Sequence, residues 1–342
     1  EYFMHHAENM DRAAALLSLG TEETPEDNSM FPYEYERLEL PKDEEGYCVS
    51  FSPDNESGIV EFFNTYGVVV VHDILTDEES SKTEDEIWEF ISRHSNGVER
   101  EKPETWEKWP ELKHLGILGN EFILSTQCFE NRQNPKLANV FRNILGTKDV
   151  FVNVGRASAM RPTRDILING ELVDKPKWKT IPKWVHWDMN PWTGLTTTFS
   201  FRATNPEQNR GYNVTKLQGI LSCVDCGPKD GGFHCVPGFQ NHIRGWANKN
   251  LHHFPKHDFD LAGSIQVPKD DPILNDVQTV PIRKGSALIW SSCLPHATFP
   301  NDSNHGRMIQ YIKMARKDDP SVAPIFQNAA LLPDGFSLSP LG

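Results

Sequence analysis

The chain has 342 residues, of which 38% are hydrophobic and 10% aromatic, and its formal net charge is −14. This composition is ample for a packed core and excludes wholesale disorder. An acidic balance of this size disfavours nucleic acid or an anionic membrane surface as a partner. No apolar run reaches the length of about 20 residues that crosses a bilayer, so we expect no membrane span.

The N-terminal region predicts no secretory signal. Glu1–Met10 lacks the basic start and the apolar stretch of a signal peptide, and Glu1–His6 looks like a tag remnant. Residues 1–57 are predicted to comprise this remnant and, after it, an extended, acidic arm. The six scattered cysteines indicate reduced thiols, which is typical of a cytoplasmic protein. We expect a monomer.

Regular structure is predicted from about residue 58. The β-branched run Gly67–Val71 predicts a buried strand. Thr76 and Glu79 form a capping-box pattern, which predicts the start of an amphipathic helix. A further helix is predicted over Leu137–Leu145, ended by Gly146.

Short β-type runs dominate the chain from residue 150 onward. These runs are Val150–Ala157, Leu195–Phe201, Leu217–Val224, Phe233–Val236, Val277–Ile282, Ala287–Ser291 and Met308–Ala315. Short strands separated by turn residues indicate an all-β sandwich or barrel rather than βαβ units. The predicted fold is therefore mainly β with flanking helices, with an N-terminal helical layer packed on one β-barrel. Residues 58–342 are expected to form a single domain.

His186 and Asp188 form the first candidate ligand pair. On a strand, residues i and i+2 point to the same face, so the imidazole and the carboxylate converge. With a second histidine from a distant strand they would form a 2-His-1-carboxylate facial triad, which leaves half of an Fe(II) octahedron open. The pair alone is weak evidence, because His6 and Glu8 repeat the spacing by chance. A structural His–Asp hydrogen bond is an equally good reading of the pair.

His296 is the candidate for the second histidine, and Arg307 follows it by eleven residues. We expect these residues to lie on two antiparallel neighbouring strands joined by a short loop, which would bring their side chains together. The planar guanidinium of Arg307 matches the far carboxylate of a dicarboxylic co-substrate, although an ordinary salt bridge is the alternative. Thr298 shares a strand face with His296 and can donate its hydroxyl to the same carboxylate.

The order of these motifs resembles the phytanoyl-CoA dioxygenase family of Fe(II)/2-oxoglutarate-dependent oxygenases. The His186 motif is followed by Gly231–Gln240, and then by a histidine with a threonine two residues on and an arginine eleven residues on. Glu61–Val71 and the capped helix after it look like the N-terminal strand and helix of that family. The resemblance covers about residues 59–315. It implies a double-stranded β-helix core, of the jelly-roll, cupin-like type.

The resemblance also implies roles for individual residues. The catalytic residues, which hold the iron, would be His186, Asp188 and His296. The co-substrate would be bound by Arg307, Thr298 and Gln218, the last of these assigned from strand alternation. Fe(II), 2-oxoglutarate and O₂ would be the cofactors. Trp187 stands where acyl-CoA-hydroxylating members often have glutamine, and residues 202–216 look like an added loop, so an acyl-CoA substrate is not implied.

The predicted function is oxidation of a small molecule, with hydroxylation as the default outcome and succinate and CO₂ as co-products. Desaturation or oxidative cyclisation of a metabolite uses the same oxidant. A non-catalytic β-helix protein that binds or scaffolds, and an oxygenase acting on protein, remain as alternatives.

Other patterns in the sequence have simpler structural explanations. The Cys223–Cys226 pair reads as core thiols, His252, His253 and His257 as surface histidines, and the Trp178–Trp192 tryptophans as core packing.

Overall fold

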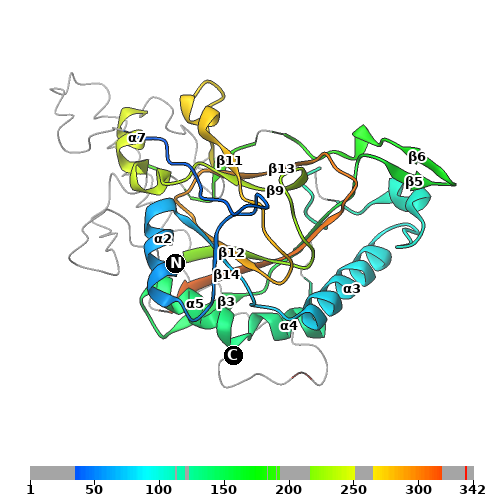
Figure 1. The fold of residues 1–342 in the computed structure, drawn as a ribbon, viewed down its shortest axis with the longest axis horizontal. Coiled ribbons are helices and arrows are strands. Elements are labelled where there is room, and N and C mark those ends of the chain that lie inside the picture. The colour runs from blue at the N-terminus through cyan, green and yellow to red at the C-terminus, as the bar shows by residue number, and fades with distance from the viewer. Residues whose placement is uncertain are drawn as a thin grey trace, which may run out of the picture.

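Two β-sheets form the body of the protein, as Figure 1 shows. The computed structural model describes residues 35–111, 114–119, 123–182, 184–189, 191–192, 216–250, 265–317 and 336. The larger sheet contains, in spatial order, β1 (Ser50–Phe51), β2 (Val68–Val71), β12 (Ala287–Ser291), β8 (Lys216–Ser222), β14 (Arg307–Arg316) and β3 (Val150–Asn153), with β4 (Ala157–Met160) also paired to β14. The smaller sheet contains β10 (Ile265–Gln266), β7 (His186–Trp187), β13 (His296–Asn301), β9 (Asp230–Cys235) and β11 (Gln278–Thr279).

Successive strands of the core alternate between the two sheets. β7, β9 and β13 lie in the smaller sheet, whereas β8, β12 and β14 lie in the larger one. The sheets meet through side chains such as Trp290 and Phe233, whose ring centroids are 4.5 Å apart. This alternation is the arrangement of a jelly roll, so the predicted fold class, a mainly β protein with a double-stranded β-helix core, is confirmed.

One expectation about neighbouring strands is wrong. β13 and β14 follow each other in the chain, but they pair with different strands and lie in opposite sheets. The loop over residues 302–306 therefore crosses from one sheet to the other instead of closing a hairpin. Arg307 begins a strand across the barrel interior from His296 rather than beside it in the same sheet.

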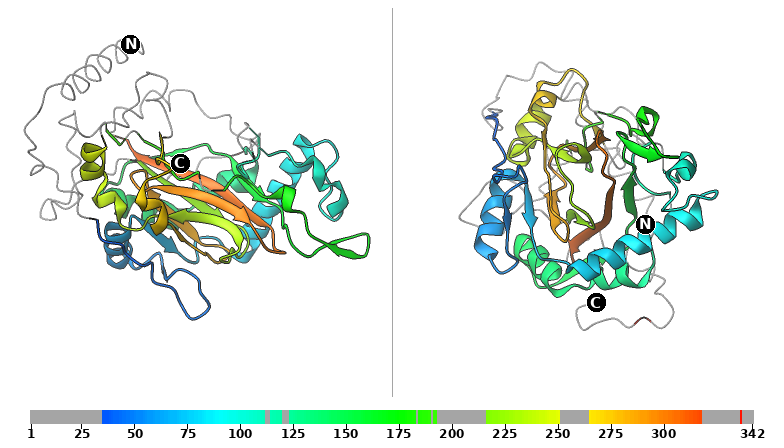
Figure 2. Two further views of the ribbon diagram at one scale, coloured as in Figure 1. Left: turned by 90° about the horizontal axis from the view of Figure 1, so that it is seen from above. Right: turned by 45° about the vertical axis from the view of Figure 1, so that its right-hand side comes forward.

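Helices cover the outer face of the larger sheet (Figure 2). They are α2 (Glu56–Tyr66), α3 (Asp77–His94), α4 (Thr126–Arg132) and α5 (Pro135–Leu145). From β14, Gln310 points into this layer, because its Nε2 donates to the backbone oxygen of Cys128 and its Oε1 accepts from Asn131, both on α4. Alternation along β14 then directs Arg307 and Lys313 to the opposite face, toward the barrel interior.

The predicted helix signals are present in the structure. The capping box of Thr76 and Glu79 begins α3, with hydrogen bonds in both directions. Asn134 caps the start of α5, and Gly146 ends it in the left-handed conformation with φ of 63°. Beyond the smaller sheet, α7 (Ile243–Lys249) packs Trp246 into the core. Short 3₁₀ helices occur at Pro103–Lys108, Pro176–Trp178, Phe239–Asn241 and Pro272–Asp276.

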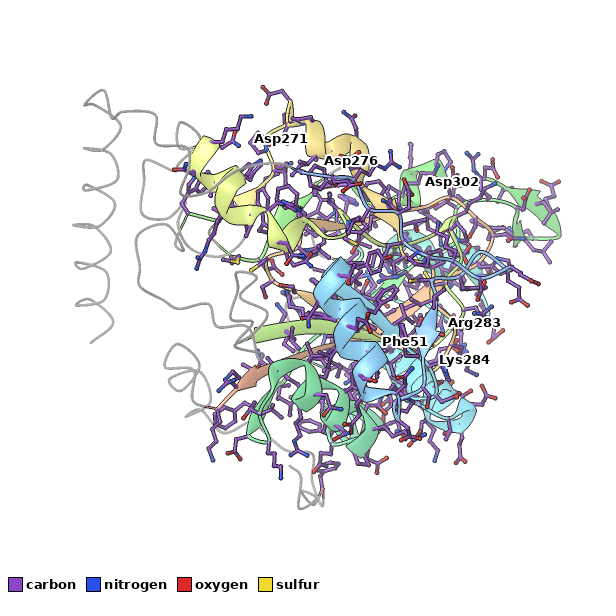
Figure 3. The ribbon with its side chains drawn as sticks, turned by 60° about the vertical axis from the view of Figure 1, so that its left-hand side comes forward. Phe51, Asp271, Asp276, Arg283, Lys284 and Asp302 are labelled. Carbon is purple, nitrogen blue, oxygen red and sulfur yellow. The ribbon has the colours of Figure 1, made fainter. Side chains whose placement is uncertain are left out.

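The described part of the N-terminal arm is held against the barrel. Arg283 forms ion pairs of 2.6 Å with Asp43 and 2.7 Å with Glu45, at the edge of the domain where Figure 3 labels it. β1, at the end of the arm, pairs in parallel with β2 and so extends the larger sheet. The division into an arm over residues 1–57 and a domain over 58–342 stays a prediction, because residues 1–34 lie outside the described ranges.

A projecting hairpin was not predicted. β5 (Ile166–Ile168) and β6 (Glu171–Val173) are joined by Asn169 and Gly170, both with positive φ. Asn-Gly is the preferred pair for this two-residue turn, so the signal was in the sequence. The predicted strand over Leu195–Phe201 and nearly all of the predicted 202–216 loop lie outside the described residues. None of the described helices combines the length and the apolar character that a membrane crossing requires.

Candidate metal centre

Two histidines from different strands face each other in the smaller sheet. His186 of β7 and His296 of β13 are directly opposite each other in the antiparallel register. Their ring centroids are 4.6 Å apart, and each side chain is about 5% exposed. Side chains of directly opposed residues stand on the same face of a sheet. The pairing therefore brings together two residues that are far apart in the sequence.

Asp188 completes a cluster of three candidate ligands. Its Oδ1 lies 3.3 Å from Nε2 of His186, and its Oδ2 lies 3.7 Å from Nε2 of His296. One ligand atom from each of the three residues lies within 4.8 Å of the other two. Neighbouring ligands at about 2.1 Å from a metal ion in an octahedron lie about 3 Å apart, so small side-chain adjustments suffice to bind a metal. The two nitrogens and one carboxylate oxygen suit Fe(II).

The backbone orients both imidazoles toward this point. Nδ1 of His186 lies 3.1 Å from the backbone oxygen of Trp184, and Nδ1 of His296 lies 2.8 Å from that of Leu294. An Nδ1–H that donates to a carbonyl leaves Nε2 unprotonated and available as a ligand. The ring of Trp184 also stacks on His186, with centroids 4.4 Å apart. These contacts orient both rings so that Nε2 faces Asp188.

The charge of Asp188 is stabilised by its neighbours. Burial alone would raise the pKa of Asp188, but the hydrogen bonds with His186 and His296 and the charge of Lys313 outweigh it and hold that pKa well below its usual range. Nζ of Lys313 lies 4.0 Å from Oδ2 of Asp188. Burial, together with the neighbouring His186, lowers the pKa of His296, which favours the neutral imidazole that binds metals. Asp188 is therefore favoured as an anion and His296 as a neutral imidazole, which are the charge states in which these side chains bind a metal ion.

Arg307 lies in the barrel interior and is 1% exposed. Its Nη1 donates to the hydroxyl of Ser158 at 3.2 Å, while its Nε has no hydrogen-bond partner. No described carboxylate forms an ion pair with it, so among these residues the salt-bridge alternative finds no support. A buried guanidinium without an anionic partner is costly, and it fits a site that receives a carboxylate from a ligand.

The other two predicted co-substrate residues also face the interior. Thr298 lies two residues beyond His296 on β13, is 9% exposed, and its backbone oxygen accepts a hydrogen bond from Trp184. Gln218 of β8 is 4% exposed, and its Nε2 has no partner among the described residues. No ligand contact distinguishes their roles, so both assignments stay predictions.

Sequence reasoning missed Lys313, Trp290 and Phe233 as neighbours of the site. The rings of Phe233 and Trp290 lie 5.5 and 5.3 Å from that of His296. Lys313 is six residues after Arg307, an even spacing that places both on one face of a strand. That periodicity could have identified Lys313 from the sequence.

The predicted tryptophan group is divided between core and site. Trp187 and Trp192 pack on Trp246, with centroids 4.6 and 5.6 Å apart, as core residues. Trp187 points away from the cluster because it alternates with the two ligands on either side of it. Trp178 belongs to a separate aromatic cluster with Trp106. Of the predicted group, Trp184 is the residue that contacts a candidate ligand.

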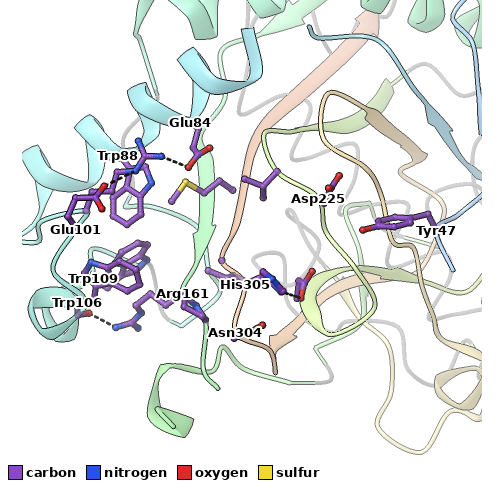
Figure 4. A pocket seen from close by; sticks show the side chains of 17 residues that line it. Tyr47, Glu84, Trp88, Glu101, Trp106, Trp109, Arg161, Asp225, Asn304 and His305 are labelled. Carbon is purple, nitrogen blue, oxygen red and sulfur yellow. Dashed lines mark hydrogen bonds and ion pairs between the residues drawn. The ribbon is translucent and has the colours of Figure 1, made fainter. Parts of the chain in front are cut away.

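A cavity of about 650 Å³ lies apart from the metal centre (Figure 4). It is lined by Trp88, Trp106 and Trp109, and none of the candidate ligands takes part in its walls. Arg100 lies over the Trp88 ring at 5.6 Å and forms ion pairs with Glu84 and Asp85. The aromatic surface of this cavity is thus partly covered by the protein's own cation.

His234 lies on the outer face of the smaller sheet, stacked on Phe299 with centroids 3.9 Å apart. Burial lowers the pKa of His234 to about 4, below the unfolded value, so the unfolded chain takes up the proton first. This group should therefore reduce the free energy of unfolding by about 2 kcal/mol as the pH falls from 7 to 5. His234→Phe, which keeps the stack, should flatten that loss in urea titrations. An unchanged slope in His234→Phe would contradict the assignment.

Comparison with known proteins identifies the family of the chain. The family model "Phytanoyl-CoA dioxygenase (PhyH)" matches residues 63–309. A Dictyostelium discoideum protein named "Putative phytanoyl-CoA dioxygenase" is 31% identical over an alignment of 278 positions that covers 74% of each chain. Among solved structures, GIG2 (DUF1479) from Candida albicans has a TM-score of 0.54 at 14% identity, covering 90% of this chain and 73% of its own. AviO1 from Streptomyces viridochromogenes has a TM-score of 0.46 at 15% identity, covering 78% and 97%.

The match to GIG2 concerns the fold alone, whereas the family model spans the candidate ligands and Arg307 together. The resemblance seen in the motifs is thereby confirmed: this chain belongs to the phytanoyl-CoA dioxygenase family.

Proposed function

We propose that this protein is an Fe(II)/2-oxoglutarate-dependent oxygenase that oxidises a small molecule, by hydroxylation as the default outcome. One observation carries the proposal. Three candidate iron ligands converge in the barrel interior, and a buried arginine with no anionic partner among the described residues lies in the same interior. Membership of an oxygenase family supports Fe(II), 2-oxoglutarate and O₂ as the cofactors.

Each of the candidate site residues would have its own role. His186, Asp188 and His296 would bind the iron from one side, which leaves the other side of the coordination sphere for co-substrate and O₂. Arg307 would bind the far carboxylate of 2-oxoglutarate, and Thr298 would lie beside the co-substrate. Once bound, iron and 2-oxoglutarate supply the activation of O₂, and the co-substrate leaves as succinate and CO₂.

Aromatic side chains would keep water away from the centre. Phe233, Trp290 and Trp184 surround the two histidines on the described sides, and Phe233 is 4% exposed. A dry site strengthens the electrostatic interactions within it and limits side reactions of a strong oxidant. The chain's own contribution to catalysis would thus be ligand geometry, co-substrate placement and exclusion of water.

Iron-dependent turnover of 2-oxoglutarate tests this function. The wild type, loaded anaerobically with Fe(II) and 2-oxoglutarate, should develop the visible charge-transfer band of a chelated complex, and O₂ should then be consumed with formation of succinate. His186→Ala should bind no stoichiometric iron and form no succinate. His72→Ala, at an exposed histidine, should behave as the wild type. A wild type without iron, band or succinate would support a non-catalytic binding protein instead.

A further inference from the structure

Three nitrogen donors lie side by side on the inner face of the larger sheet. Gln218 of β8 is directly opposite Lys313 of β14 on one side and Trp290 of β12 on the other. Directly opposed residues point to the same face, so an ammonium, a primary amide and an indole N–H form a row across three adjacent strands. We refer to Lys313, Gln218 and Trp290 as the donor row.

The donor row faces the candidate metal centre. Nζ of Lys313 lies 4.0 Å from a carboxylate oxygen of Asp188, and the ring of Trp290 lies 5.3 Å from that of His296. Gln218 is between them in the register. The two ends of the row therefore contact two different candidate ligands, and the row runs along the side of the metal centre formed by the larger sheet.

Two of these donors have no acceptor among the residues that the structure describes. Nε1 of Trp290 and Nε2 of Gln218 are buried and have no hydrogen-bond partner in the described part of the chain. Almost all buried polar groups in proteins are paired, so two adjacent unpaired donors indicate an acceptor that arrives with a ligand. Lys313, at 4.0 Å from Asp188, is beyond hydrogen-bond distance, and its side chain is 51% exposed. Its ammonium is available to a ligand that enters from solvent.

The chemistry of the row suits a carboxylate. An ammonium supplies the opposite charge, while the amide and the indole supply neutral donors to the remaining oxygen lone pairs. Arg307 lies six residues before Lys313 on β14, which separates their Cα atoms by about 20 Å. The two cations thus mark the two ends of one interior face, one buried and one open to solvent.

We propose that the donor row binds a carboxylate of the primary substrate and so places the substrate beside the iron. This inference rests on the proposed function, in which Arg307 takes the far carboxylate of 2-oxoglutarate. It narrows the substrate class to small organic acids. The other source of the same chemistry is the near carboxylate of 2-oxoglutarate, and the experiment separates the two.

Binding of acetate to the anaerobic complex of enzyme, Fe(II) and 2-oxoglutarate tests the proposal. Acetate should shift the charge-transfer band saturably in the wild type. Lys313→Met should weaken acetate binding by about tenfold or more, as loss of a charge-assisted hydrogen bond predicts, and Lys313→Arg should restore part of it. Gln218→Met should also weaken acetate binding without lowering the Tm, because it removes an unpaired buried donor.

Lys317→Met is the matched control, since it removes a lysine just past the same strand, whose Nζ lies over Phe151. It should leave acetate binding unchanged. If acetate has no effect but Lys313→Met and Gln218→Met weaken 2-oxoglutarate, the row holds the co-substrate and the substrate assignment is overturned.

If neither variant changes the binding of acetate or 2-oxoglutarate, the row is not a carboxylate site. Acetate that bound the iron alone would give this result, because it would be indifferent to Gln218→Met. Absence of the band in the wild type would instead overturn the proposed function, and this inference with it.

Discussion

Asp188→Asn should weaken Fe(II) binding by at least about a hundredfold, since even outer partners of metal ligands contribute ten- to a hundredfold. The substitution keeps the shape of the side chain but removes the one negative charge among the three candidate ligands. Two neutral imidazoles and a neutral amide compete poorly with water for a hard divalent ion. The loss of succinate formation should follow the loss of iron.

Anaerobic Fe(II) titration, followed by calorimetry, measures this effect directly. Asp302→Asn is the matched control, because Asp302 is also an ion-paired aspartate, bound to Arg164 and Lys179 at the surface. That variant should bind iron as the wild type does. Wild-type iron affinity in Asp188→Asn would show that the metal, if bound, is held elsewhere.

The acidic side of the pH profile gives a second check on Asp188. Its folded-state pKa lies below the unfolded value, so the carboxylate stabilises the fold above the unfolded pKa and loses this contribution as the pH falls through the folded one. Asp188→Asn should therefore lower the free energy of unfolding of the iron-free protein at neutral pH. As the pH falls into the acid range, the difference in this free energy between the variant and the wild type should become smaller. Asn at this position should thus impair both iron binding and the interactions with His186 and His296.

The ligand pair was predictable from sequence because its geometry is local. Two residues at a spacing of two share a strand face wherever the strand lies, so His186 and Asp188 needed no knowledge of the fold. The helix boundaries at Thr76 and Gly146 were predictable for the same reason. Each is set by hydrogen bonds or backbone conformation within one turn.

Long-range relations were harder to predict. The opposition of His186 and His296 depends on the register between β7 and β13, which no local pattern specifies. The eleven residues between His296 and Arg307 fit a hairpin and a crossing between sheets equally well, and the expectation of a hairpin was wrong. The family resemblance assigns Arg307 to the co-substrate site from its spacing alone, and this assignment stays a prediction.

The donor row lay beyond sequence reasoning for a different reason. Lys313 and Trp290 are ordinary residues of β-strands, and their interest comes from the neighbours that the strand register gives them and from the indole N–H of Trp290, which has no partner among the described residues. An unpaired donor can be recognised only when everything around it is known. Gln218 was placed on the interior face of its strand from alternation alone, and the structure has it on that face. Alternation could not show that Gln218 lies between Lys313 and Trp290.

Arg307→Met should raise the Kd for 2-oxoglutarate by about a hundredfold or more, because a bidentate charged contact to a carboxylate is lost. The charge-transfer band of the Fe(II) complex should still form, but only at much higher co-substrate concentrations. Arg307→Lys should recover little of the affinity, since an ammonium lacks the planar fork of the guanidinium. Anaerobic titration of 2-oxoglutarate against the band measures all three proteins.

A second buried arginine provides the contrast that makes this test specific. Arg132 is 3% exposed, but its guanidinium donates to the backbone oxygens of Cys128, Ile123 and Gly155. Arg132→Met removes these three charge-assisted hydrogen bonds and should lower the free energy of unfolding by about 2–4 kcal/mol, with 2-oxoglutarate affinity unchanged.

Among the described residues Arg307 has no such set of carbonyl partners, so Arg307→Met should leave the stability of the ligand-free protein unchanged or raised. The two variants should therefore show opposite patterns, one losing stability and the other losing co-substrate. If Arg307→Met behaves like Arg132→Met, the guanidinium supports the fold rather than the ligand. The far carboxylate of 2-oxoglutarate would then need another cation in the barrel, and Lys313, on the same face of β14, would be the first to examine.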